Sequence, residues 1–205
     1  MTPKHNFKHV QAPLDKSTLK DLKSGDRVLL SGTIYTLRDA GHKRLLELLE
    51  QGEAPPFPLE NAVIYYVGPS PAVGGRAIGS AGPTTSSRMD PYTPQLIAQG
   101  LSGMIGKGYR DHCVVDAMKE YGAVYFAATG GAGALLSKTI LEAKVLAWED
   151  LGPEALRQLV VKDMPLTVII DTEGRDLYLE GPRTWRESHG ILDPSLESEA
   201  ECPTV

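Results

Sequence analysis

Ala62-Val63-Ile64-Tyr65-Tyr66-Val67-Gly68 is an unbroken apolar run that predicts a buried β-strand. Before this run, Asp39 to Gln51 carries leucines with charges between them, the pattern of an amphipathic helix, and Gly52 follows where a helix should end. After the run, Pro91 to Gln99 predicts another helix. Strand and helix patterns alternate in this way along most of the chain, with short connections, which favours an α/β fold.

The same alternation extends outward in both directions. Further strands are expected over 27–35, 101–105, 123–128, 145–148 and 166–170, and further helices over 111–121, from Ala134 and from Pro153. The sequence divides into an N-terminal arm over 1–24, an α/β body over 25–186 and a polar C-terminal tail over 187–205. The arm is expected to hold one short helical stretch over 17–22.

The bulk composition limits the class of protein. At 205 residues with a hydrophobic fraction of 41%, the chain is expected to form one globular domain, and no apolar run is long enough to cross a bilayer. A net charge of −5 gives no electrostatic reason to expect a nucleic-acid partner. The lysine-rich start lacks the apolar centre of a secretory signal. Cys113 and Cys202 fit a reducing, cytoplasmic setting and are too few for a cysteine-only metal site, so no metal ligand is expected here.

The most distinctive loop is Gly79-Ser80-Ala81-Gly82-Pro83-Thr84-Thr85-Ser86-Ser87-Arg88-Met89-Asp90, called the hydroxyl loop below. Glycine lets backbone N–H groups approach a ligand closely, and Arg88 can bind a carboxylate through two parallel hydrogen bonds. These properties predict a loop that binds a small, oxygen-rich anion. The alternative is a polar surface turn in which Ser87 or Asp90 caps the following helix.

A second group of polar residues lies where the strand 27–35 gives way to a helix. Ligand sites in α/β proteins gather at such strand ends. Arg38 can meet a carboxylate there, and Asp39 can cap the helix and orient a neighbour. His42 lies one turn into the helix, where a lone histidine is more often a packed residue than a catalyst.

Two glycine-rich turns follow later strands. Gly106-Lys107-Gly108 can bring an ammonium group close to a ligand, although a lysine in a surface turn is also common. Thr129 to Gly133 lacks the lysine and hydroxyl of a P-loop, so it is interpreted as a close-packing turn or a turn beside an anion.

Several of these side chains together would suit a dianion such as a dicarboxylate. The set contains three cations and two hydroxyls: Arg38, Thr84, Thr85, Arg88 and Lys107. No nucleophile–base pair, acidic pair or His/Cys metal cluster accompanies them in the sequence. The chain is therefore expected to supply half of an active site.

The order of four motifs resembles the C-terminal domain of class I fumarases, and the separate β subunit of two-subunit fumarases and L-tartrate dehydratases. The motifs are Arg-Asp-x-x-His, Gly-Pro-Thr-Thr-x-x-Arg-Met-Asp, Gly-Lys-Gly and Gly-Gly-Ala-Gly-Ala-Leu, and the resemblance runs over about residues 25–186. It implies an α/β fold of the swivelling β/β/α three-layer type. It also implies a hydro-lyase acting on a dicarboxylic acid, with a 4Fe–4S cluster held by three cysteines of a partner α subunit.

The resemblance further implies a role for each matching residue. Thr84 matches the threonine assigned as the catalytic base that takes the C3 proton of malate. Nearby cations and the exclusion of water would help a threonine hydroxyl act as a base. The substrate-binding matches are Arg38, Thr85, Arg88 and Lys107, with Asp39 and His42 in support.

The leading interpretation is therefore the β subunit of a hetero-oligomeric iron–sulfur fumarate hydratase, acting on fumarate and malate. An L(+)-tartrate dehydratase is the enzyme alternative, because it needs the same carboxylate contacts and only more room for a second hydroxyl. A module that binds small anions without catalysis is the alternative outside enzymes. As a subunit, the chain is expected to present an apolar face to its α partner.

Overall fold

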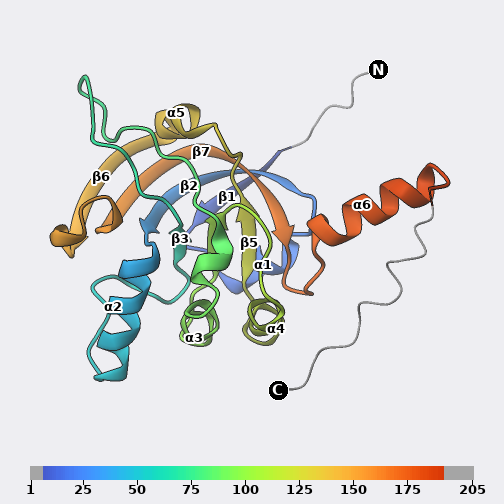
Figure 1. Ribbon diagram of the computed structural model, residues 1–205, viewed down its shortest axis with the longest axis horizontal. Helices are drawn as coiled ribbons and strands as arrows, with labels where there is room; N and C mark the ends of the chain where they lie inside the picture. Colours follow the sequence, from blue (N-terminus) through green and yellow to red (C-terminus); the bar gives the residue numbers. More distant parts are fainter. Residues whose placement is uncertain (1–6, 192–205) are drawn as a thin grey trace.

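A computed structural model describes residues 7–191 and shows a mixed α/β fold around one seven-stranded sheet (Figure 1). The strands are β1 (Lys8–Ala12), β2 (Arg27–Thr36), β3 (Val63–Tyr65), β4 (Gly103–Gly106), β5 (Val124–Ala127), β6 (Ile140–Ala147) and β7 (Leu156–Ile170). The helices are α1 (Lys16–Asp21), α2 (Asp39–Glu50), α3 (Thr93–Ala98), α4 (His112–Tyr121), α5 (Gly133–Leu136) and α6 (Leu177–Ser188). Short 3-10 turns are η1 (Ser86–Met89), η2 (Ser137–Thr139) and η3 (Glu149–Glu154). The expected α/β class is confirmed.

The sheet closes on itself through five of its strands. β2, β3, β4 and β5 are successive parallel neighbours, and β7 pairs antiparallel with both β5 and β2. β1 extends the sheet beside β2, and β6 extends it beside β7. Because parallel strands point the same way, the chain leaves β2, β3, β4 and β5 at one shared edge. This edge carries the candidate site.

Helices α2, α3 and α4 connect the successive parallel strands and lie on one side of the sheet (Figure 1). Both faces of β3 are therefore covered. Val63 and Tyr65 pack with apolar residues of β2, β5 and β7, whereas Ile64 and Tyr66 pack with residues of α3 and α4. Burial on both faces explains why this strand is an unbroken apolar run in the sequence.

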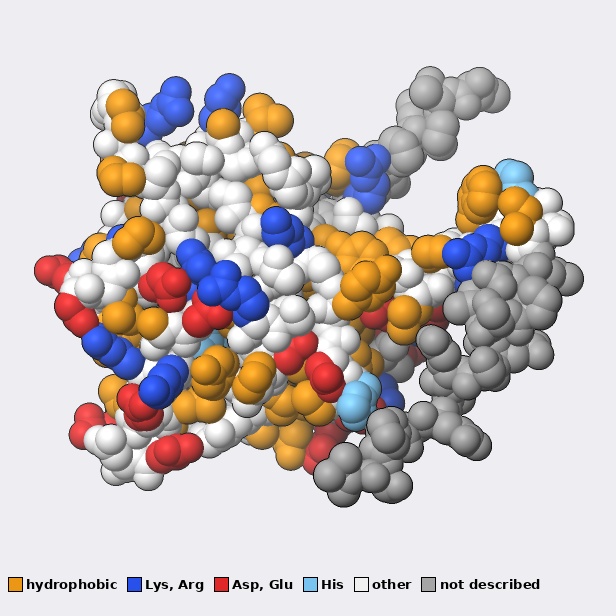
Figure 2. Space-filling view, viewed as in Figure 1, with side chains coloured by type: hydrophobic (Ala, Val, Ile, Leu, Met, Phe, Trp, Pro, Cys, Tyr) orange, Lys and Arg blue, Asp and Glu red, His pale blue; other side chains and the backbone are white. Residues whose placement is uncertain are grey.

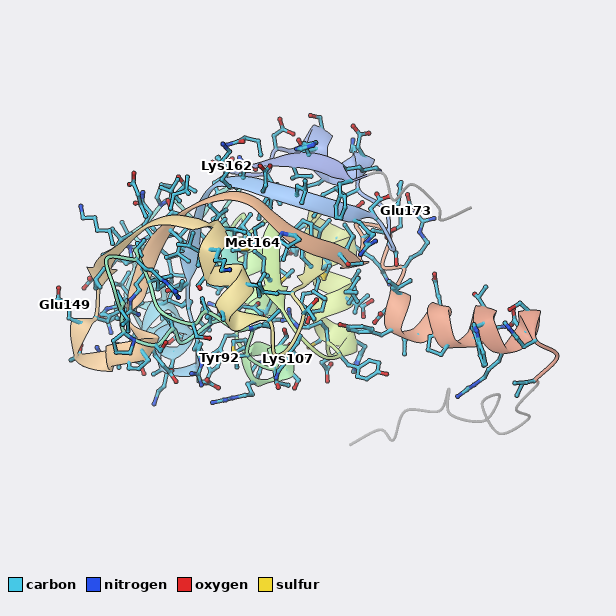
Figure 3. All side chains as sticks on the ribbon, turned by 90° about the horizontal axis from the view of Figure 1, so that it is seen from above. Tyr92, Lys107, Glu149, Lys162, Met164 and Glu173 are labelled. Atoms are coloured by element: carbon cyan, nitrogen blue, oxygen red, sulfur yellow. The ribbon has the colours of Figure 1, made fainter. Side chains whose placement is uncertain are left out.

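The prediction of a helix from Pro153 is wrong. This segment ends the turn η3 and then forms β7, a strand of 15 residues that pairs with β2, β5 and β6. Buried residues alternate over only parts of β7: the alternation is lost at Arg157 and Gln158, and again at Lys162 and Asp163, where Asp163 has a φ of 51°. Figure 3 labels Lys162 and Met164 beside this irregularity. A break of this kind hides the two-residue period by which a strand is recognised.

The two ends of the chain differ from the expected arm and tail. Within 1–24, β1 pairs with β2 and the side chains of Leu14, Leu19 and Leu22 are buried in the core. These residues belong to the packed body rather than to a loose arm. At the other end, the sequence analysis missed α6, which projects from the body in Figure 1. The expected tail beyond residue 191, with Cys202, lies outside the described residues. Within 7–191, no helix combines the length and apolarity that a membrane span requires.

Candidate active site

The candidate site residues follow the parallel strands at their shared edge. Arg38 and Asp39 begin α2 just after β2, and Lys107 follows β4. The hydroxyl loop comes after β3 and ends in η1, which carries Arg88. Lys107, labelled in Figure 3, forms a parallel bridge with Thr85 of that loop. The topology thus collects at one edge the residues that are dispersed in the sequence.

Backbone hydrogen bonds hold Thr84 and Thr85 between β3 and Lys107. The Thr84 N–H donates to the Tyr66 carbonyl at 2.7 Å, and the Thr84 carbonyl accepts from the Lys107 N–H at 3.3 Å. The Ser86 N–H then donates to the Lys107 carbonyl at 2.8 Å. Thr84 is half-buried, whereas Thr85 and Lys107 are exposed. The backbones of Thr84, Thr85 and Lys107 are therefore fixed beside one another.

Glycine is required where these loops cross. A Cβ at Gly106 would lie 2.0 Å from the Ser86 Oγ, so a larger residue would push the hydroxyl loop away from β4. A Cβ at Gly133 would lie 2.8 Å from the backbone N of Gly82, and the Gly133 carbonyl accepts from the Ala81 N–H at 3.1 Å. The Thr129–Gly133 turn thus acts as a close-packing support for the loop, one of the two readings of its sequence.

Arg38, Asp39 and Arg88 form one charged network. Figure 2 shows that basic and acidic side chains lie side by side on the face that it draws. Arg88 Nε donates to Asp39 Oδ1 at 2.8 Å, and Arg88 Nη2 lies 2.8 Å from Asp39 Oδ2. Arg38 Nη2 lies 3.2 Å from Glu154 Oε1 and 3.7 Å from Asp39 Oδ2. Asp39 therefore holds one edge of the Arg88 guanidinium. The opposite edge forms no hydrogen bond within residues 7–191, and the side chain is 50% exposed.

His42 is completely buried beneath this network. Its Nδ1 lies 2.9 Å from the Arg38 carbonyl, and because a carbonyl only accepts, Nδ1 carries the proton. Burial lowers the pKa of His42 from 6.5 to about 4, so the ring is neutral near pH 7. His42 therefore supports the backbone of Arg38 and does not itself reach the surface, which fits a supporting role.

The burial of His42 predicts a loss of stability in acid. In the unfolded chain His42 binds a proton near pH 6.5, and in the folded chain only near pH 4. The contribution of His42 to the unfolding free energy is therefore fully present above about pH 6.5 and is lost as the pH falls toward 4. We expect this one group to remove about 3 kcal/mol of unfolding free energy over that range. Urea unfolding at a series of pH values measures the slope. The slope should flatten in His42→Asn, which keeps a donor for Arg38, but not in His112→Asn at an exposed histidine. Equal slopes in wild type and His42→Asn would contradict the assignment.

A buried ion pair that the sequence analysis missed anchors the hydroxyl loop from below. Arg110 Nε donates to Asp90 Oδ1 at 2.7 Å, and both side chains are buried. The other oxygen of Asp90 accepts from the Asp111 N–H at 2.7 Å, and Arg110 Nη2 donates to Thr93 Oγ1 at 2.9 Å. Asp90 thus joins the loop to the segment after Lys107. The capping role considered for Asp90 is not observed.

Tyr125 of β5 makes a second buried connection that the sequence analysis missed. Its hydroxyl donates to the Gly108 carbonyl at 3.0 Å and lies 2.9 Å from the Ser86 Oγ. Burial raises the pKa of Tyr125, so the phenol keeps its proton. Since that single proton goes to Gly108, the Ser86 hydroxyl must donate to the tyrosine oxygen. One phenol therefore fixes the hydroxyl loop to the Gly-Lys-Gly turn.

The described part of the chain, residues 7–191, does not offer the ligands of an iron–sulfur cluster. Such clusters are held by several cysteine thiolates. Within residues 7–191 no group of three or more His, Cys, Asp or Glu side chains is placed to hold a metal ion, and the described cysteine, Cys113, is exposed. The candidate residues are instead cations and hydroxyls, which are groups that bind anions.

Comparison with known proteins shows to which protein family this chain belongs. The chain belongs to the Fumarase C-terminus family, which it matches over residues 3–181. The resemblance inferred from the four motifs is thereby confirmed.

The individual relatives carry the names of hydro-lyases. The chain is 37% identical over 173 residues to fumarate hydratase 2 of Leishmania major, covering 82% of this chain and 30% of the relative. It is 40% identical over 154 residues to the aerobic class I fumarate hydratase of Escherichia coli K12, covering 74% of this chain and 28% of that relative. It is 38% identical over 173 residues to the putative L(+)-tartrate dehydratase subunit beta of Methanocaldococcus jannaschii, covering 82% and 89%. The chain thus spans less than a third of these fumarate hydratases and most of that beta subunit.

Proposed function

We propose that this chain is the β subunit of a two-subunit 4Fe–4S hydro-lyase that hydrates fumarate reversibly to L-malate in the cytoplasm. The observation that supports the proposal is that Arg38, Arg88 and Lys107 lie at the same edge of the sheet as Thr84 and Thr85, with Thr85 bridged to Lys107 through the backbone. Three cations beside two hydroxyls suit a substrate with two carboxylates and one reacting C–H or C–O group. Membership of the family supports the hydro-lyase chemistry.

Each residue of this edge has a role in the proposal. Arg38, Arg88 and Lys107 bind the two carboxylates, and Thr85 adds a contact beside them. Thr84 takes the proton from C3 when malate loses water and returns it when fumarate gains water. Thr84 is half-buried and its backbone is hydrogen-bonded to that of Lys107; in the proposal the cations of the assembled site favour the deprotonated hydroxyl. In the proposal this β/β/α three-layer domain swivels and closes over the partner subunit. The closure excludes water from the reacting atoms.

The cluster belongs to the partner in this proposal. The α subunit contributes the cysteines, and the bound cluster supplies a Lewis acid for the leaving hydroxyl. Two findings support such a division: the donor set of residues 7–191 does not fit a cluster, and the chain spans most of a relative that is itself named a subunit. The partnership also explains why basic and hydroxyl groups lie at an open edge rather than inside a closed pocket.

L(+)-tartrate is the second candidate substrate. The specific observation in its favour is the 89% coverage of the putative L(+)-tartrate dehydratase subunit beta. Tartrate presents the same two carboxylates, so the three cations serve it equally well. The difference lies in one additional hydroxyl, which the partner side of the site would have to accommodate.

Anaerobic co-expression with the α subunit tests the proposed function. We expect fumarate hydration only when both chains are present, and no turnover by either chain alone. Assays with fumarate, L-malate and L(+)-tartrate on the same preparation identify the substrate. A complex that carries its cluster and converts none of the three would overturn the proposal. Calorimetric titration of this chain with succinate would then show whether it is an anion-binding module.

A further inference from the structure

The start of α2 depends on a residue from a distant part of the chain. Its N-cap position is Arg38, whose side chain makes no capping hydrogen bond. Glu154, at the end of η3, instead accepts from the Ala40 N–H through Oε2 at 3.1 Å. A carboxylate at this position satisfies an unpaired helix N–H and interacts favourably with the helix dipole. Glu154 therefore caps α2 from outside.

The other oxygen of Glu154 holds the Arg38 guanidinium. Oε1 lies 3.2 Å from Arg38 Nη2, and the two side chains are only 23% and 20% exposed. Gly68 lies against the guanidinium as well, since a Cβ there would lie 2.6 Å from Arg38 Nη1. Arg38 Nε is buried. The guanidinium is thus confined by a carboxylate and by bare backbone.

The turn that carries Glu154 is itself held in shape. Arg157 donates to the carbonyls of Gly152, Pro153 and Ala155 at 2.8 to 3.1 Å. Gly152 has a φ of 55°, a conformation that favours glycine. Asp150 of the same turn also pairs with Arg44 of α2, but these side chains are 62% and 38% exposed, so this pair contributes little to the shape of the turn. Figure 3 labels Glu149, the first residue of this turn, at the outer edge of the molecule.

We propose that Glu154 is a positioning residue for the reaction: it acts through Arg38 and sets the direction in which that arginine meets a substrate carboxylate. This inference rests on the proposed function. Glu154 fixes Nη2 of Arg38, and Gly68 allows Nη1 to lie against the backbone, so the plane of the guanidinium is set before a substrate carboxylate arrives. Correct placement of a carboxylate-binding arginine governs productive binding, and an error of about 1 Å costs up to about a hundredfold in rate.

Glu154→Gln tests this role with little change in shape, because the amide oxygen still accepts from Ala40. We expect kcat/KM of the assembled enzyme to fall about tenfold to a hundredfold, mainly through KM, since a ground-state carboxylate contact is weakened. In an Arg38→Ala background the same substitution should have no further effect. Asp150→Asn, which breaks the neighbouring ion pair of the same turn, is the matched control and should leave both constants unchanged. Independent, multiplying losses from Glu154→Gln and Arg38→Ala would overturn the proposal.

A readout without substrate separates this inference from the proposed function. The arginine Nε–H signals of the ¹⁵N-labelled chain report hydrogen exchange with water for each buried guanidinium. In Glu154→Gln the Arg38 Nε–H should exchange at least about tenfold faster, because fewer contacts confine it, while Arg110 stays unchanged. Unchanged exchange at Arg38 would refute the positioning role even in an active enzyme. Faster exchange in a complex that turns over no dicarboxylate would instead leave the positioning intact and refute the proposed function.

Discussion

Arg88→Ala is expected to lower kcat/KM for the dicarboxylate by about a thousandfold, the size expected when a charged hydrogen-bonding partner is removed from a buried complex. Asp39 holds one edge of the Arg88 guanidinium, so under the proposed function the arginine is oriented before substrate arrives. Arg88→Lys should retain part of the activity, because an ammonium keeps the charge but loses the planar fork.

The stability of this variant should barely change. Arg88 is half-exposed, and ion pairs of this kind contribute about 0–1 kcal/mol to folding. Arg44→Ala removes a comparable exposed pair with Asp150 elsewhere on α2 and is the matched control, expected to keep its activity. Steady-state kinetics of the assembled enzyme, with urea unfolding of each chain, separates the two effects. Full activity in Arg88→Ala would remove the arginine from the site.

Asp90→Ala is expected to cost about 3–5 kcal/mol of unfolding free energy, because it leaves the buried Arg110 guanidinium without its counter-charge. The Arg110 side chain is 0% exposed and that of Asp90 is 8% exposed. The variant also leaves the Asp111 N–H without its acceptor. The same change breaks the connection between the hydroxyl loop and the segment after Lys107, so activity should fall with stability.

Urea unfolding measures this effect as a shift in the midpoint at an unchanged slope. Asp150→Ala, which removes a carboxylate from an exposed ion pair, should cost no more than about 1 kcal/mol. The double variant Asp90→Ala/Arg110→Met should recover part of the loss, because it removes the uncompensated charge as well. A loss below about 1 kcal/mol in Asp90→Ala would show that the pair does not anchor the loop.

The sequence predicted the parallel part of the fold well because each element there has a local signal. The apolar run over 62–68 marks β3, although only Val63–Tyr65 pairs as a strand, and the leucine pattern with Gly52 marks α2. β7 was not predictable over its full length, because its pairing partners lie on three different strands and its alternation breaks at Lys162. Long-range pairing of this kind leaves little trace in a local window.

The candidate site shows the same division. The residues proposed to bind a ligand lie in glycine-rich, hydroxyl-rich or charged motifs, so Arg38, Arg88 and Lys107 could be selected from the sequence. The residues that support them could not. Tyr125 looks like an ordinary strand residue and Glu154 like an ordinary loop carboxylate, yet each fixes a site residue distant in the chain. Their importance depends on a geometry that only the folded chain creates.

The closure of the sheet by β7 also has a consequence for protein synthesis. β7 follows all the parallel strands in the chain, and it reaches β2 through contacts such as Arg157 N–H to Thr36 Oγ1, across 121 residues. Glu154 and Arg157 arrive with the same late segment. A nascent chain that still lacks this segment can form the parallel sheet of β2, β3, β4 and β5. It cannot form the contact between Glu154 and Arg38. The ribosome must therefore release nearly the whole domain before the site exists, and a partner that recognises the finished site would bind after translation of β7.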